Sequence, residues 1–295
     1  ERAVGGVAGE GQAGDGGLVV RIGADERHGD SRGVIARGPR IGRLRIARPL
    51  VLVVDLDACG RELVHPGLVE IPGGGVLLDG LRERLNEYAA LGAKFAKWRA
   101  VININIEEGM PSDTCIEANV HALARYAALC QEAGIVPMVE PEVIMDGEHD
   151  IDDSFVVTEK VLRALFNALY QHNVMLEGTI LKASMVISGK DCDEQAGVED
   201  VADYTVQCLK SAVPAALPGI VFLSGGQSDD DATAHLNEMN KTENLPWPLS
   251  FSYGRAMQSA ALKIWAKDIA NNVAEAQKTV YARAEANGLA AKGEL

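Results

Sequence analysis

The chain has 295 residues, of which 47% are hydrophobic and 24% are charged, and its formal net charge is −14. This length is sufficient for one large domain or two small ones with a substantial core. The acidic charge argues against nucleic acid as the main partner. No apolar run approaches the ~20 residues that a membrane-spanning helix needs. We therefore expect binding to neither nucleic acid nor membrane.

The cysteines and histidines indicate which cellular compartment and which metal chemistry to expect. Five cysteines occur without a CxxC pair, which is typical of a reducing compartment and predicts a cytoplasmic protein. Six histidines are scattered without the spacing of metal ligands, so we expect no bound metal. No secretory signal peptide is visible, and the chain begins at Glu1 rather than Met, so we expect its natural start to lie upstream.

Residues 1–93 differ in composition from all that follows. They contain no lysine, and their only aromatic residue is Tyr88. Residues 1–50 are rich in Gly and Arg, and only Leu18–Ile22 and Leu50–Leu56 resemble strands. A GC-rich genome would explain this bias, but the abrupt change favours the hypothesis that part of the stretch is translated from a shifted frame or is mis-joined. Recovery of residues 10–75 as written, by peptide mapping of protein from the native source, would reject that hypothesis.

From residue 76 onward strands and helices alternate. The expected strands are Phe95–Ile102, Ile135–Val143, Leu176–Val186, Gly219–Ser224 and Leu249–Arg255. The expected helices are Asp79–Tyr88, Ile116–Cys130, Val161–Tyr170, Val201–Ala212, one capped by Ser228, and a long Ala-rich helix after residue 255.

The polar residues of these strands recur almost evenly. Lys97, Glu140, Lys182 and Ser224 follow one another at intervals of 43, 42 and 42 residues. Strand–helix units at this spacing predict an α/β fold, a (β/α)8 TIM barrel with its site at the carboxyl ends of the strands. Residues 76–295 hold units 4–8 and the C-terminal helix. We expect residues 1–75 to form an aberrant, partly disordered N-terminal region, in which the first three units are aberrant or incomplete.

A lysine in the middle of a buried strand admits two interpretations. Strands of parallel sheets are buried on both faces, so Lys182 either pairs with a carboxylate for structural reasons or serves as a nucleophile. In the second case burial and a neighbouring cation disfavour its protonation and leave an amine that attacks carbonyl groups.

Five motifs decide between these interpretations. They are Phe95-Ala96-Lys97-Trp98-Arg99, Val139-Glu140-Pro141-Glu142, Leu176–Val186, Phe222-Leu223-Ser224-Gly225-Gly226-Gln227-Ser228 and Phe251-Ser252-Tyr253-Gly254-Arg255-Ala256. In this order they resemble class I fructose-1,6-bisphosphate aldolase, colinearly from about Leu77 to Lys292.

The resemblance implies catalytic roles position by position. Lys182 matches the lysine that forms a Schiff base with the substrate ketone, Glu140 the acid/base that dehydrates the carbinolamine, and Lys97 the lysine that assists proton transfer. Glu142 matches the neighbouring carboxylate, and Arg99 a nearby cation of the site. An iminium ion at Lys182 would stabilise the carbanion left by carbon–carbon cleavage, so no metal or other cofactor is required.

The resemblance also implies a phosphate pocket. Ser224, Gly225, Gly254 and Arg255 match the residues that hold the phosphate nearest the ketone. A glycine turn at a helix start exposes N–H groups, which suits an anion.

Three departures from the family pattern bear on catalysis. The first-strand aspartate of the family, which helps to deprotonate the C4 hydroxyl, has only Asp25 as a weak match. An ungapped count from Asp79 places Ala58 where the family has a lysine near the distal phosphate. The tyrosine-terminated tail of many members is absent, since the chain stops at Leu295.

The resemblance predicts a glycolytic lyase that cleaves fructose 1,6-bisphosphate to dihydroxyacetone phosphate and glyceraldehyde 3-phosphate, as a cytoplasmic homotetramer. An impaired aldolase-like binding or scaffold protein is the alternative, favoured by the aberrant first units. A different Schiff-base lyase or a transaldolase on the same barrel is a third candidate, which the paired phosphate motifs disfavour. A coupled cleavage assay separates the three.

Overall fold

The computed structural model describes residues 53–57 and 78–295. Within them, six strands form one parallel sheet in the order β1-β2-β3-β4-β5-β6. The expectations for residues 1–52 and 58–77, among them the strand Leu18–Ile22 and the assignments of Asp25 and Ala58, lie outside the described residues. The strands are β1 (Val53–Asp57), β2 (Phe95–Ile102), β3 (Val136–Val143), β4 (Ile180–Ala183), β5 (Ile220–Phe222) and β6 (Leu249–Phe251).

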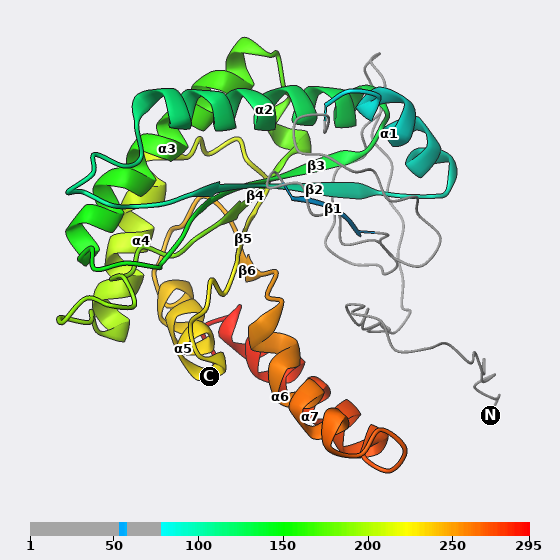
Figure 1. Cartoon of the computed structure of the whole chain (residues 1–295), viewed down its shortest axis with the longest axis vertical. Helices are drawn as coiled ribbons and strands as arrows, with labels where there is room; N and C mark the ends of the chain where they lie inside the picture. Colours follow the sequence, from blue (N-terminus) through cyan, green and yellow to red (C-terminus); the bar gives the residue numbers. More distant parts are fainter. Residues whose placement is uncertain (1–52, 58–77) are drawn as a thin grey trace.

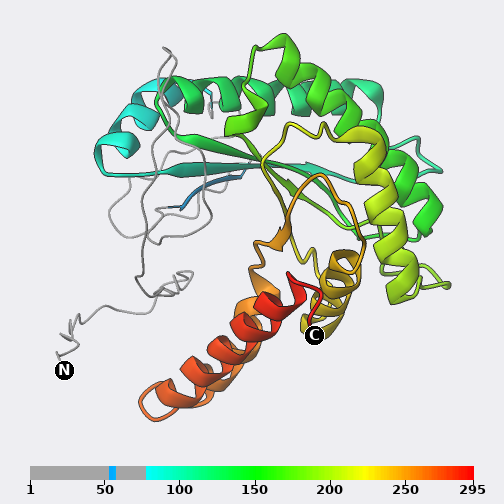
Figure 2. The same ribbon diagram turned by 180° about the vertical axis from the view of Figure 1, so that it is seen from behind.

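Helices connect the strands and cover the sheet. In Figure 1 α2, α3 and α4 follow one another around the outside of the sheet, and each contacts the next. The last two helices, α6 and α7, pack together as a hairpin that extends away from the sheet, as both views show (Figures 1 and 2). The helices are α1 (Leu81–Ala90), α2 (Asp113–Glu132), α3 (Ile151–Gln171), α4 (Val198–Ala212), α5 (Asp229–Asn240), α6 (Arg255–Lys267) and α7 (Val273–Ala290), with a 3-10 turn at Leu176–Gly178.

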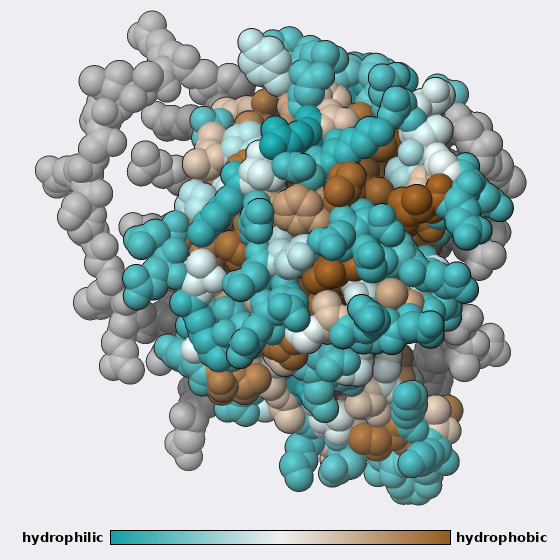
Figure 3. Space-filling view, turned by 90° about the vertical axis from the view of Figure 1, so that its left-hand side faces the viewer, coloured by the Kyte–Doolittle hydropathy of each residue, from teal (hydrophilic) through white to brown (hydrophobic). Residues whose placement is uncertain are grey.

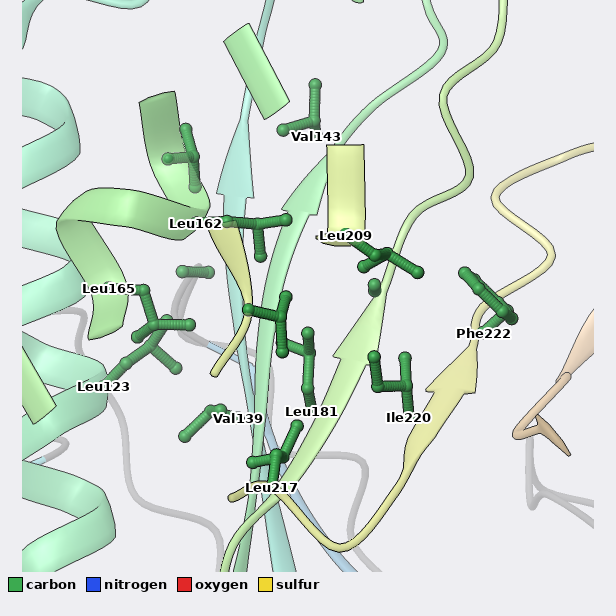
Figure 4. Close-up of a cluster of buried hydrophobic side chains, with 14 of the residues drawn as sticks. Leu123, Val139, Val143, Leu162, Leu165, Leu181, Leu209, Leu217, Ile220 and Phe222 are labelled. Atoms are coloured by element: carbon green, nitrogen blue, oxygen red, sulfur yellow. The ribbon is translucent and has the colours of Figure 1, made fainter. Parts of the chain in front are cut away.

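The core lies between the sheet and these helices. Leu181 of β4 and Val139 of β3 are fully buried, and Figure 4 shows them beside Leu165 of α3. Full burial of a leucine side chain stabilises the fold by about 1.5–3 kcal/mol. Successive residues of a strand point to opposite faces of a sheet. The neighbours Glu140 and Lys182 therefore point away from this core, toward the face on which polar residues gather.

Two prolines lie in β3, a strand that has neighbours on both sides. The N–H groups of Val136 and Ile144 donate toward β2, to the carbonyls of Lys94 and Ile102, each at 3.0 Å. Along a parallel strand, successive backbone N–H groups point alternately to the two neighbouring strands. The even-numbered residues of β3 donate toward β2, so the odd-numbered Pro137 and Pro141 face β4. There the ladder is short, since β4 pairs only with Met138 and Val139. The prolines thus cost little pairing.

The structure confirms the alternation of strands and helices after residue 76 but corrects several boundaries. The last strand ends at Phe251 rather than Arg255, and α2 begins at Asp113 rather than Ile116. The lysine strand begins at Ile180 rather than Leu176, because residues 176–178 form the 3-10 turn. Helix α3 begins at Ile151, ten residues before Val161, because the Asp150 carboxylate caps it by accepting the N–H of Asp153 at 2.8 Å. The single Ala-rich helix expected at the end of the chain is two helices, α6 and α7.

The molecular surface is mostly hydrophilic on the face shown in Figure 3, where hydrophobic patches are scattered among polar side chains. In the part of the chain that the structure describes, no helix combines the length and apolar character of a membrane span.

Candidate active site

The centre of the site is a carboxylate that bridges two lysines. Oε1 of Glu140 lies 2.8 Å from Nζ of Lys182, and Oε2 lies 2.9 Å from Nζ of Lys97. All three residues are buried, with exposed fractions of 2% for Glu140 and 7% for each lysine. Charges are rarely buried unless they are paired, and here one carboxylate serves two amines.

Strand register brings the three residues together. Val139 of β3 pairs with Leu181 of β4, so Glu140 and Lys182 follow at the same level of adjacent strands. Lys97 lies on β2 opposite Met138, one strand away on the other side of Glu140. The parallel register thus aligns three polar residues that are far apart in sequence on one face of the sheet.

The start of the lysine strand is fixed by a glutamine from α2. Nε2 of Gln131 donates to the carbonyl of Met175 at 2.8 Å and to the hydroxyl of Thr179 at 3.2 Å, and its Oε1 accepts the N–H of Met175 at 2.9 Å. Thr179 is completely buried. These bonds hold the turn directly before β4, and the position of Lys182 follows from it.

A second ion pair lies beside the first. Nε of Arg99 contacts Oε2 of Glu142, and Glu142 is 5% exposed while the Arg99 side chain is 31% exposed. Arg99 is the backbone partner of Glu140 across β2 and β3. On the opposite side of β2, the register places Asp55 opposite Lys97 and Asp57 opposite Arg99. The site cations predicted from sequence therefore lie on one strand between two strands that carry acidic residues.

The expected phosphate residues lie at the carboxyl ends of β5 and β6, which are neighbours in the sheet. Ser224 is buried and its carbonyl accepts the N–H groups of Gly226 and Gln227 at 2.7 and 2.8 Å, which closes a tight turn. Gly225 has φ of +60°, a conformation that glycine adopts most readily. On the adjacent strand, Gly254 precedes α6 and the exposed Arg255 is its first residue.

The structure thus gathers Lys97, Glu140 and Lys182 into direct contact, with Arg99 and Glu142 adjacent in register. Ser224, Gly225, Gly254 and Arg255 form a second group two or more residues beyond their strands. Among residues 53–57 and 78–295, no cluster of three or more His, Cys, Asp or Glu side chains is arranged to hold a metal ion.

Sequence analysis missed three residues near the glycine turn. Asp146 and His149 follow β3, and Lys190 follows β4; Lys190 forms an ion pair with Asp146 at 2.6 Å. His149 is 6% exposed, and burial lowers its pKa. Their position just after strand ends was the available signal, since the site of such a fold lies at the carboxyl ends of its strands.

This arrangement defines a class of protein. An α/β fold with a parallel sheet, in which two buried amines share one carboxylate beside a glycine turn suited to phosphate, has the groups that imine chemistry on a phosphorylated carbonyl compound requires.

Comparison with known proteins gives the family. The family model of class-I fructose-bisphosphate aldolase matches residues 70–295. A probable class 1 fructose-bisphosphate aldolase of Xanthomonas campestris is 72% identical over 217 residues, which cover 74% of this chain and 64% of the relative. One from Xylella fastidiosa is 66% identical over 239 residues, covering 81% of this chain and 68% of the relative.

A solved structure agrees. Fructose-bisphosphate aldolase of Plasmodium falciparum, crystallised with TRAP and a small-molecule inhibitor, superimposes with a TM-score of 0.73 at 45% identity, covering 81% of this chain and 69% of that one. The chain belongs to the class I fructose-bisphosphate aldolase family. It spans about two thirds of the length of the curated relatives that it matches.

The comparisons confirm the family and the α/β barrel class predicted from sequence. The role of each residue stays a prediction, as does the division into residues 1–75 and 76–295.

Proposed function

We propose that the chain is a lyase that cleaves fructose 1,6-bisphosphate to dihydroxyacetone phosphate and glyceraldehyde 3-phosphate through a Schiff base on Lys182. The observation that carries the proposal is the bridging carboxylate, because Glu140 contacts both Lys182 and Lys97 in a buried position. A purely structural ion pair needs one amine, whereas imine formation needs a nucleophilic amine, a proton donor and a means of keeping the amine neutral.

The steps follow from these contacts. The neutral amine of Lys182 attacks the ketone carbon, and the hydroxyl group of the carbinolamine leaves as water with a proton that the Lys97 ammonium group passes through Glu140, so that an iminium ion forms. Lys97 on the other oxygen of Glu140 supplies charge that disfavours protonation of Lys182 and can return the proton. When the C3–C4 bond breaks, its electron pair moves to the iminium and forms an enamine. The C4 hydroxyl loses its proton to the Glu140 carboxylate, and the aldehyde product departs.

Substrate phosphate is assigned to the second group of residues. The turn at Gly225 and the guanidinium group of Arg255 lie beyond adjacent strand ends. The N–H groups of Gly226 and Gln227 are used within the turn, so the guanidinium group and the remaining backbone N–H groups of the turn are the donors assigned to the anion. By resemblance to the family, we further propose a cytoplasmic homotetramer that acts in glycolysis on this sugar phosphate.

The test is a coupled assay of fructose 1,6-bisphosphate cleavage with purified chain, and Lys182→Met as the matched control. We expect turnover in the parent chain that Lys182→Met abolishes and that EDTA leaves unchanged. Turnover that persists in Lys182→Met would refute the mechanism. Imine formation on Lys182 without turnover would instead favour the binding or scaffold alternative.

A further inference from the structure

Two loops at the carboxyl ends of β3 and β4 are joined by their backbones. The N–H of Lys190 donates to the carbonyl of Met145 at 2.7 Å, and the N–H of Gly189 donates to the carbonyl of His149 at 2.7 Å. A Cβ on Gly189 would lie 2.2 Å from the carbonyl oxygen of Gly147, so no other residue fits there. This contact fixes the backbone of Lys190 and hence the origin of its side chain.

The Lys190 side chain lies against the glycine turn after β5. A Cβ built on Gly226 would lie 3.1 Å from both Cε and Nζ of Lys190, so the ammonium group rests directly on the turn. Gly226 has φ of +123° and the preceding Gly225 has φ of +60°. Both positive φ angles favour glycine, and at Gly226 the end of the Lys190 side chain also lies where a side chain would begin.

The ammonium group of Lys190 forms an exposed ion pair with Asp146. Oδ1 of Asp146 lies 2.6 Å from Nζ of Lys190, and the two side chains are 62% and 40% exposed. An ion pair this exposed adds little to stability, typically about 0–1 kcal/mol. The ammonium group is a compact cation with three donors, and the pair with Asp146 uses one of them.

We propose that Lys190 is a further phosphate-binding residue of this site, with its ammonium group beside the Gly225–Gly226 turn. The inference rests on the proposed function, which assigns the substrate phosphate to this turn. A phosphate received by the turn would lie beside the ammonium group, since Nζ lies 3.1 Å from the position that a Cβ on Gly226 would take. Lys190 then raises affinity for phosphorylated ketones over neutral ones, and so acts on specificity rather than on bond cleavage.

A merely structural pair makes a different prediction. If Lys190 and Asp146 only pin the two loops together, removal of either one perturbs the turn equally, for phosphorylated and neutral ligands alike. If Lys190 binds phosphate, the two substitutions differ: loss of the cation weakens phosphate binding, whereas loss of the neighbouring carboxylate does not.

The experiment measures borohydride trapping of the imine as a function of ketone concentration in the full chain. In Lys190→Met we expect the half-saturating concentration of dihydroxyacetone phosphate to rise about 5- to 10-fold, as for loss of one solvent-accessible charge-assisted contact. The half-saturating concentration of dihydroxyacetone, which lacks the phosphate, is expected to stay unchanged. Asp146→Asn is expected not to raise either value.

The control is Lys241→Met. Lys241 also forms a 2.6 Å ion pair, with Glu238, and is 49% exposed. It lies at the far end of α5, about 18 Å of helix from Ser228. In this variant we expect no change in the half-saturating concentration of either ketone. An equal rise for both ketones in Lys190→Met, or a rise in Asp146→Asn, overturns the inference.

A second measurement separates this inference from the proposed function. Binding of inorganic phosphate, followed by calorimetry, needs no imine. Absence of trapping in the parent chain counts against the proposed lyase. An unchanged phosphate affinity in Lys190→Met counts against the role of Lys190, and a roughly 5-fold loss supports it.

Discussion

The bridging carboxylate makes a quantitative prediction for Glu140→Gln. This substitution keeps the shape of the side chain but removes the negative charge that lies 2.8 and 2.9 Å from the Nζ atoms of two buried lysines, of which at least Lys97 is charged in the proposed mechanism. Removal of one partner from a buried pair destabilises a protein by about 3–5 kcal/mol, because the remaining charge stays buried. We expect the free energy of unfolding at pH 7, measured by urea titration, to fall by about this amount.

The deficit should shrink as pH rises toward the range in which lysine loses its proton, about 10. A neutral amine beside a neutral amide no longer carries the cost of a buried charge. Glu142→Gln is the matched control. The partner of Glu142, Arg99, keeps its charge at every accessible pH. The loss of stability in Glu142→Gln should therefore not recover as pH rises. A deficit below about 1 kcal/mol for Glu140→Gln, or the same pH dependence in both variants, would refute the account of the bridge.

Three further predictions follow from individual groups. Arg255→Ala removes a charge-assisted contact of ~1.5–3 kcal/mol, so KM for fructose 1,6-bisphosphate should rise about 10- to 100-fold. The control Lys263→Ala, on the same helix, should leave KM unchanged. An unchanged KM in Arg255→Ala would mean that the phosphate binds elsewhere. Burial lowers the pKa of three histidines. The three are His149, His172 and His235. The unfolded chain then binds more protons than the folded chain below about pH 6.5, so the midpoint of thermal unfolding should fall as pH drops through that value. His149→Gln should make this fall shallower. The same dependence of the midpoint on pH in His149→Gln and the parent chain would contradict this. Burial raises the pKa of the Cys130 and Cys208 thiols to about 12, so thiol reagents should modify them only in denaturant, and peptide mapping that finds them labelled in the native chain would contradict this.

Much of the fold after residue 76 could be predicted because its strands carry polar residues at an even spacing and its helices carry apolar stripes. Ser228, expected to cap a helix, does accept the N–H of Asp231 at 3.0 Å. Trp98, in the expected strand Phe95–Ile102, is 2% exposed and lies in the core. Boundaries were less accessible, because the turn before β4 is set by Gln131, a residue more than forty positions away.

The site could be assembled from the sequence only in part. The lysines and glutamates were found because charges in strands are unusual, and a shared carboxylate follows once the strands are in register. Asp146 and Lys190 follow strand ends, but this signal did not single them out because charged residues in loops are ordinary. Their role depends on the contact of Lys190 with Gly226, which only the folded chain shows.

Borohydride reduction in the presence of dihydroxyacetone phosphate, followed by mass mapping, tests the central claim most directly, since reduction fixes the ketone on the amine that formed the imine. The account predicts one adduct per chain, on Lys182, that is lost in Lys182→Met while the variant remains folded. An adduct on Lys97 or on a surface lysine, or labelling that persists in Lys182→Met, would contradict it.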